Sequence, residues 1–160
     1  MPSAEHYEKA PLGRLVAMAG HLAGQRWSRY VSESYGLSPA GASVLLSLSG
    51  ERKMTHKDLA DRCLVRPATL TGVVDTLVRS GHVERRDDDS DRRTVWVTLT
   101  RKGVAVATKV HRRVAGEGPR GSERAIRALT SVDANPEHEA VIRRFLIELI
   151  VRLSEAEEQE

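Results

Sequence analysis

Residues 81–103, with the sequence GHVERRDDDSDRRTVWVTLTRKG, carry the most informative pattern in the chain. Apolar and polar side chains alternate over residues 94–99, which predicts a half-buried strand. A shorter strand is predicted over residues 83–86, and a run of aspartates, a serine and two arginines separates the two strands. Because such a polar run is typical of a turn, we expect a β-hairpin with a charged tip.

Two short helices are predicted before this hairpin. Thr55 and the aspartate three residues later resemble a capping box, so the first helix should run over residues 56–63. Pro67 suits the first turn of the second helix, whose apolar residues recur every three or four positions up to about residue 80. A tight turn at residues 64–65 would join them. Helix, turn, helix and hairpin in this order predict a winged helix-turn-helix module.

The rest of the chain is predicted to be helical. Apolar periodicity indicates helices over residues 10–32 and 38–50, and again over residues 101–115 and 136–155. A further short helix is predicted at 123–129. The 160 residues, 40% of them hydrophobic, are typical of one soluble domain. The expected fold class is therefore mainly α with a small β-hairpin wing (α+β).

The last predicted helix is too apolar for a monomer. More than half of the positions from Ala140 to Leu153 are apolar, on more than one face, whereas a helix packed on one side needs three or four per two turns. A central core helix is the alternative, but the small module cannot surround it. We therefore expect a homodimer, with residues 1–36 and 104–160 as a helical dimerisation region and residues 37–103 as the winged module. The interface residues would be Leu12, Val16, Phe145, Leu146, Leu149, Ile150 and Leu153.

Charge is distributed unevenly along the chain, whose net charge is +3. Residues 52–113 contain 15 lysines and arginines and 8 acidic residues, a net charge of +7, while the two flanks together carry −4. A basic middle segment between acidic flanks favours a polyanion as partner. A solvated surface with uneven charge is the alternative.

The sequence also disfavours several classes of protein. No apolar run reaches the length of a membrane span and the N-terminus lacks a secretory pattern, so we expect a cytoplasmic protein with no membrane partner. The one cysteine, Cys63, excludes an internal disulfide, and the histidines lack metal-ligand spacing. The sequence contains no phosphate-binding loop, nucleophile elbow or acid–base pair. We therefore expect no enzymatic activity, with no catalytic residue, metal or cofactor.

Five segments of the module follow one another with a characteristic order and spacing. They are THKDLA at 55–60, PATLTGVVDTL at 67–77, RSGHVER at 79–85, DSDRR at 89–93 and VTLTRKG at 97–103. Together they resemble the MarR family of bacterial transcription regulators. The resemblance implies a triangular homodimer that represses transcription by binding a palindrome in double-stranded DNA. In many members a small aromatic or phenolic ligand, or oxidation of a cysteine, releases the DNA.

The second helix of the module would enter the major groove, where each base pair presents its own donor and acceptor pattern. Arg66, at the position of a Ser or Thr cap in many members, could read guanine bidentately or clamp a phosphate, and both readings stay open. Thr69 and Thr71 could contact bases or phosphates, and Gly72 stands where many members have an arginine. The other candidates for contact with DNA are Thr55, His56, Lys57, Pro67, Ala68 and Arg79.

The wing tip would contribute a separate contact. Arg92 and Arg93 could reach a narrow minor groove, whose negative potential attracts arginine. By resemblance, Arg93 makes this contact, and Asp91 pairs with it and holds its orientation. A solvated hairpin tip is the alternative.

A ligand site is predicted on the first helix. Arg26 falls within the apolar stripe of this helix, and a buried cation is costly unless it is paired. Its partner could be a ligand carboxylate or phenolate, or an acidic group of the second chain, and both readings stay open. Met18, His21, Trp27 and Tyr30 could line a pocket nearby, although a place in the core is the favoured reading for Trp27.

Three functions are therefore considered. The first is a repressor released by a ligand, the second a DNA-binding regulator without a small-molecule ligand, and the third a protein-interaction module that has lost DNA binding. The basic middle segment and the wing motif disfavour the third. Cys63 is expected in an apolar and unreactive position, which disfavours oxidation as the signal.

Overall fold

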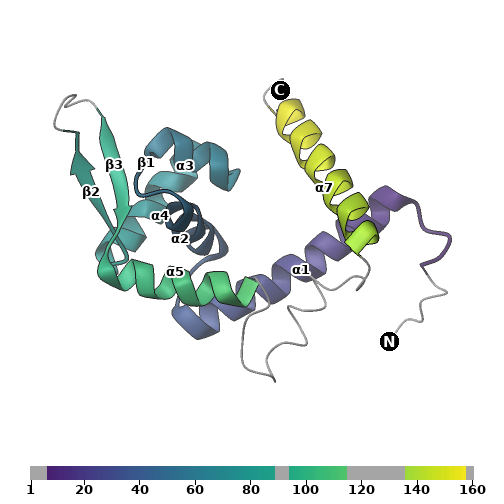
Figure 1. Cartoon of the computed structure of the whole chain (residues 1–160), viewed down its shortest axis with the longest axis horizontal. Helices are drawn as coiled ribbons and strands as arrows, with labels where there is room; N and C mark the ends of the chain where they lie inside the picture. The colour runs from purple at the N-terminus through teal and green to yellow at the C-terminus, as the bar shows by residue number, and fades with distance from the viewer. Residues whose placement is uncertain (1–6, 89–93, 115–135, 158–160) are drawn as a thin grey trace.

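The computed structural model describes residues 7–88, 94–114 and 136–157 (Figure 1). The elements in chain order are α1 (Leu12–Tyr35), α2 (Pro39–Gly50), β1 (Met54–Thr55), α3 (His56–Cys63), α4 (Pro67–Arg79), β2 (Val83–Asp87), β3 (Val95–Leu99), α5 (Arg101–Val114) and α7 (Pro136–Glu157). Helices dominate, and the strands form one small antiparallel sheet. The predicted fold class is confirmed. The helix predicted at 123–129 lies outside the described residues.

The elements form a module at one end of the molecule and long helices that lead away from it (Figure 1). The module consists of α2, α3, α4 and the sheet, with the β2–β3 hairpin projecting from its edge. Both α1 and α5 pack against α2. The last helix, α7, lies at the N-terminal end of α1, far from the hairpin, and makes few contacts with other described elements.

Helix ends follow the local signals in the sequence, with one exception. The Oγ of Ser38 accepts a hydrogen bond from the N–H of Gly41 at 3.0 Å, and Pro39 starts α2 as predicted. Helix α1 ends at Gly36, which adopts the left-handed φ of 64°. The predicted end of this helix at residue 32 was wrong by three residues, because the polar residues 32–34 continue it on the solvent side.

The sheet has the strand order β1–β3–β2, and its register confirms the predicted alternation. Val97 of β3 pairs with Met54 and Arg85, and its side chain is buried. Trp96 pairs with Thr55 and Arg86 and therefore lies on the opposite, outer face of the sheet. The sequence did not predict β1, because two residues are too few to show an alternating pattern.

One hydrophobic core unites the module. Its fully buried residues come from α1, α2, α3, α4, α5 and the sheet, and each buried valine or leucine contributes roughly 1.5–3 kcal/mol when removed from water. They include Val31, Val44, Leu45, Leu59, Leu70, Val74, Val83 and Val97. None comes from α7, so the core of the described chain does not depend on that helix.

The N-terminus of α5 is attached to the end of α4. The hydroxyl of Thr100 donates a hydrogen bond to the carbonyl oxygen of Gly81 at 2.6 Å. The ammonium of Lys102 donates to the carbonyl oxygen of Ser80 at 2.7 Å. Gly81 itself has a left-handed φ of 72°, which glycine adopts without steric cost. The segment that precedes β2 and the segment that follows β3 are therefore joined to each other at the base of the wing.

Close packing reinforces this junction. Gly103 of α5 lies so near the backbone of His82 that an added Cβ would be 1.9 Å from the His82 carbonyl oxygen. The His82 ring is buried, and its Nδ1 lies 2.7 Å from the Ser80 hydroxyl. Burial, followed by the charge of Lys102, lowers the pKa of His82, so the ring stays neutral at neutral pH.

Candidate nucleic-acid interface

The turn between α3 and α4 is short and well defined. Leu64 adopts a left-handed φ of 52°, and the N–H of Val65 donates to the carbonyl oxygen of Ala60 at 3.1 Å. Helix α4 begins at Pro67, and the side chain of Arg66 makes no capping hydrogen bond. The first N–H groups of α4 consequently receive no side-chain acceptor from the N-cap residue.

The start of α4 presents its predicted DNA-contacting residues to solvent. Leu70, Val74 and Leu77 form the buried side of the helix. Exposed on the remaining surface are Arg66, Pro67, Ala68, Thr69, Thr71, Gly72 and Arg79. A Cβ added at Gly72 would meet no atom within 4 Å, so the surface there is open. The structure thus brings all these predicted site residues together on one face of the module.

Helix α3 adds the predicted phosphate contacts beside this face. The Oγ1 of Thr71 lies 3.3 Å from the Nε2 of His56 and donates to the carbonyl oxygen of Pro67 at 3.1 Å. The Oγ1 of Thr55 accepts a hydrogen bond from the N–H of Asp58 at 3.2 Å, which caps α3 as predicted. Lys57, one residue into α3 from His56, is exposed. The starts of the two helices therefore form a continuous polar surface.

The hairpin is held against α4 by an ion pair. The Nη2 of Arg85 on β2 lies 2.6 Å from the Oδ1 of Asp75 on α4. A hollow of about 450 Å³ opens beside this pair, between Gly72, Val78 and Arg79. The wing and α4 therefore share one surface. The predicted wing-tip residues Asp91, Arg92 and Arg93 lie outside the described residues.

Residues 37–95, which span α2 to the first residue of β3, match the model of the MarR family. They form a MarR-family domain. Members of this family are transcriptional regulators and not enzymes.

Two curated proteins similar to this chain are helix-turn-helix transcriptional regulators. The transcriptional repressor YetL of Bacillus subtilis is 32% identical over 108 residues, which cover 64% of this chain and 65% of YetL. The transcriptional regulator SarZ of Staphylococcus aureus is 28% identical over 82 residues, which cover 51% of this chain and 55% of SarZ. The chain thus spans between half and two thirds of these curated relatives.

A solved structure with bound DNA has the same fold. A cysteine-to-serine variant of MarR from E. coli, in complex with operator DNA, is 27% identical and has a TM-score of 0.68. The similarity covers 92% of this chain and 99% of that one. It therefore extends beyond the MarR-family domain into the flanking helices.

Two negative findings concern the described ranges only. Within residues 7–88, 94–114 and 136–157, no helix is both long and apolar enough to span a membrane. Over the same residues, no three His, Cys, Asp or Glu side chains group as they would around a metal ion.

The predicted ligand residues of α1 only partly come together. Trp27 and Tyr30, which flank the MarR-family domain, are half-buried, with ring centroids 6.1 Å apart. The hydroxyls of Tyr30 and Tyr35 lie 3.1 Å apart. Burial, followed by this hydrogen bond, raises the pKa of Tyr30 to about 12, so its phenol stays neutral. Met18 is half-buried farther along α1 and His21 is exposed, so neither joins this aromatic cluster.

The expectation of a buried Arg26 was wrong for the single chain. Arg26 is exposed, because most of α1 extends beyond the module and only Val31 of this helix is buried. The buried arginine is Arg113 of α5, which is 7% exposed and lies with its guanidinium carbon 5.4 Å from the Tyr30 ring centroid. The Nε of Arg113 has no hydrogen-bond partner among the described residues. The buried residues of α5 are Gly103, Ala107, Val110 and Arg113, at successive spacings of four, three and three, so the helical periodicity of the sequence already placed Arg113 on the buried side.

Cys63 occupies a half-buried position between α3 and α2. Its Sγ lies 3.6 Å from the Ser47 hydroxyl. Burial raises the pKa of the Cys63 thiol, which outweighs the opposing effects of Ser47 and Arg62. The thiol therefore stays protonated, in line with the unreactive position expected from the sequence.

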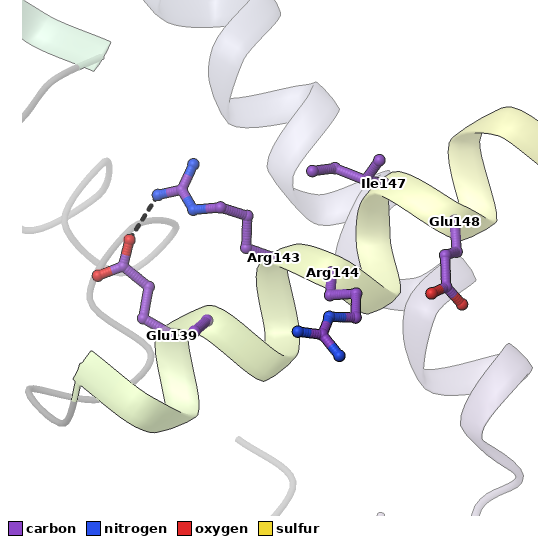
Figure 2. Close-up of a pocket in the computed structure, with 6 residues that line it drawn as sticks. Glu139, Arg143, Arg144, Ile147 and Glu148 are labelled. Carbon is purple, nitrogen blue, oxygen red and sulfur yellow. Dashed lines mark hydrogen bonds and ion pairs between the residues drawn. The ribbon is translucent and has the colours of Figure 1, made fainter.

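The predicted interface residues remain uncovered in the single chain. Leu12 is 61% exposed, Leu146 42%, Ile150 49% and Leu153 60%. Phe145 is exposed as well, whereas Val16 and Leu149 are half-buried. Figure 2 shows α7 beside α1, and among the described residues the hollow of about 670 Å³ at α7 is lined by residues of that helix, including the paired Glu139 and Arg143. The exposed apolar side chains of α7, which include Phe145, Leu146, Ile150 and Leu153, form a surface that is unusually apolar for a helix in contact with water.

Proposed function

We propose that this protein is a homodimeric transcriptional repressor that acts in the cytoplasm and binds a palindromic operator in double-stranded DNA. The observation that carries the proposal is the single face on which the starts of α3 and α4 expose their polar residues, with the wing held beside them. An α-helix fits the major groove, and a wing can reach the adjacent minor groove. The operator complex of the E. coli protein with this fold supports the assignment.

The base-reading contacts would come from the exposed start of α4. Ala68 and Gly72 have small side chains, so the helix can approach the base edges closely. Thr69 and Thr71 would contact bases or phosphates on either side, and Arg66 would contact guanine or a phosphate. Thr55, His56, Lys57 and Arg79 would supply phosphate contacts, which add affinity and salt dependence but no sequence information.

A dimer would double this interface and explain a palindromic site. We propose that residues 37–103 form the DNA-binding module and that residues 1–36 and 104–160 pair two chains. The uncovered apolar side chains of α1 and α7 support this division. In a twofold dimer the same surface of each chain meets its copy, so the two modules would bind two equivalent half-sites.

Fluorescence anisotropy with duplexes from the DNA flanking the gene tests this function. We expect one duplex to bind at least about a thousandfold more tightly than unrelated duplex of equal length. The logarithm of its affinity should fall linearly with the logarithm of salt concentration. Equal, weak binding to every duplex would contradict the proposal and favour a protein-interaction module.

Removal of the wing-tip arginine should weaken binding strongly. Arg93→Ala is expected to raise the Kd for the operator at least about tenfold, since a minor-groove arginine would be lost, with no change in melting temperature. Arg144→Ala, on the polar side of α7, serves as the control and should bind like the unmodified protein. An Arg93 variant of unchanged affinity would refute this role of the wing tip.

We further propose that a small aromatic or phenolic anion releases the DNA, and we assign its site to Arg113. The Nε of this buried arginine, which has no hydrogen-bond partner in the described part of the chain, lies in a cluster with Tyr30 and Trp27. A carboxylate or phenolate could pair with the guanidinium while its ring stacks on the aromatic side chains. Since α5 is also attached to the end of α4, a ligand there could move the DNA-binding face.

Arg113→Met should abolish this response without abolishing DNA binding. With salicylate and related carboxylates and phenols as probes, an active compound should raise the melting temperature of the unmodified protein and release its operator. The methionine variant keeps the apolar stem but loses the charge, so it should show neither effect. Release that persists in Arg113→Met would place the ligand elsewhere. If no compound acts on either protein, the regulator without a ligand is the better description.

A further inference from the structure

The root of the wing is fixed by side chains as well as by the backbone. The N–H of Asp88 donates to the carbonyl oxygen of Thr94 at 3.0 Å, across the two strands. This bond joins the residue after β2 to the residue before β3. The side chains that hold Asp88 in place therefore fix this end of the two strands.

Three side chains from three segments meet at this root. The indole Nε1–H of Trp96 on β3 donates to the Oδ2 of Asp88 at 2.5 Å. The ammonium of Lys53, the residue before β1, lies 4.1 Å from the centroid of the Trp96 ring. The same ammonium is 3.8 Å from the Oδ2 of Asp88. The Lys53 ammonium thus lies over the face of the Trp96 ring, and the Asp88 carboxylate accepts from its N–H. Lys53 and Asp88 also form an ion pair with each other.

The backbone alone attaches this end of the hairpin weakly. β1 has only two residues, which pair with Val97 and Trp96 near the middle of the hairpin. Beyond Trp96 the two strands of the wing pair only with each other. Lys53 extends the attachment toward the tip, because its side chain reaches from the start of β1 to Trp96 on β3 and to Asp88, the residue after β2.

We propose that Lys53, Trp96 and Asp88 form a clamp that positions the wing for DNA, an inference that rests on the proposed function. Ordering a loose hairpin during binding would cost conformational entropy, whereas a hairpin clamped beforehand loses less. The three are positioning residues and do not touch DNA. A hollow of about 430 Å³ beside the clamp is also lined by Arg52 and Arg86. Arg86 forms an ion pair with Glu84 and is therefore not counted as part of the clamp.

Substitution of Lys53 separates a clamp from a phosphate contact. Lys53→Met should raise the Kd for the operator about fivefold, with an unchanged melting temperature and an unchanged salt dependence. Lys53→Arg should retain full affinity, because a guanidinium also stacks on tryptophan. Lys109→Met, an exposed lysine of α5, controls for the loss of one charge. If Lys53 instead touches a phosphate, the slope of log affinity against log salt would drop by about one unit, and the clamp would be refuted.

The clamp can also be tested in the free protein. The chain has two tryptophans, so Trp27→Phe leaves Trp96 as the only one. In this background Lys53→Met should raise the acrylamide quenching of Trp96 fluorescence at least about twofold, and Lys53→Arg should not. Equal quenching in all three proteins would overturn the inference. If the unmodified protein binds no duplex, the proposed function is refuted. If it binds the operator and Lys53→Met binds it equally well, only the clamp is refuted.

Discussion

Among glycine-to-alanine substitutions at the described glycines, Gly103→Ala is expected to destabilise the protein most. The new Cβ would lie 1.9 Å from the carbonyl oxygen of His82. Neither atom can avoid the clash by rotating a side-chain bond, because the Cβ is fixed to the backbone of α5 and the oxygen is itself a backbone atom. Overpacking of this kind costs about 3 kcal/mol, which exceeds the gain of about 1 kcal/mol from replacing glycine in a helix. The melting temperature should therefore fall by roughly 4–8 °C.

Thermal unfolding followed by circular dichroism measures this effect. Gly72→Ala is the matched control, since its Cβ would meet open space on α4. That variant should melt at the same temperature as the unmodified protein or slightly above it. A Gly103 variant that melts like the control would show that α5 does not lie against the end of α4.

Leu146→Asp is expected to convert the dimer into monomers. In a single chain this position is 42% exposed, and a charge there would change stability by less than about 0.5 kcal/mol. In a dimer the carboxylate would be buried without a partner, at a cost of about 3 kcal/mol or more. The dimer Kd should therefore rise more than about a hundredfold, which sedimentation equilibrium can measure.

The control for this change lies on the same helix. Arg144→Asp introduces the same residue two positions away, about 200° around α7 from Leu146, and should leave the proposed dimer intact. The unmodified protein should also melt at a higher temperature when it is more concentrated, as a dimer does. This second measurement needs no variant, so it decides the question even if Leu146→Asp fails to fold. A melting temperature independent of concentration, with a monomeric mass, would rule out the interface.

Local signals made most of the fold predictable. Ser38 with Pro39, Thr55 and Gly81 mark helix ends through their own backbone preferences, and these positions hold in the structure. The alternation in β3 fixed which side chains face the core, since a strand has only two faces. The exposure of the residues at the start of α4 was predictable because the same periodicity that buries Leu70 exposes its neighbours.

Features that depend on contact between distant segments were not predictable in this way. β1 exists only because β3 lies beside it, and two residues carry no pattern of their own. Arg26 was expected to be buried because it lies within the apolar stripe of α1, but most of this helix extends beyond the module. The clamp joins residues 53, 88 and 96, and nothing in their spacing along the chain indicates that they meet. Such sites follow from the tertiary arrangement alone.

The attachment of α5 to the end of α4 allows a tilt of α5 to displace the far end of α4. Thr100, Lys102 and Gly103 attach α5 to residues 80–82, which directly follow α4, while Arg66, Thr69 and Thr71, proposed above to contact DNA, lie at the other end of that helix. Helix α4 is about 20 Å long, since its 13 residues each rise about 1.5 Å. A tilt of α5 by about 10° would therefore sweep the tip of α4 through roughly 3 Å, about the length of one hydrogen bond. In the proposed complex with DNA, a small tilt of α5 would therefore be enough to move the start of α4 into or out of register with the bases.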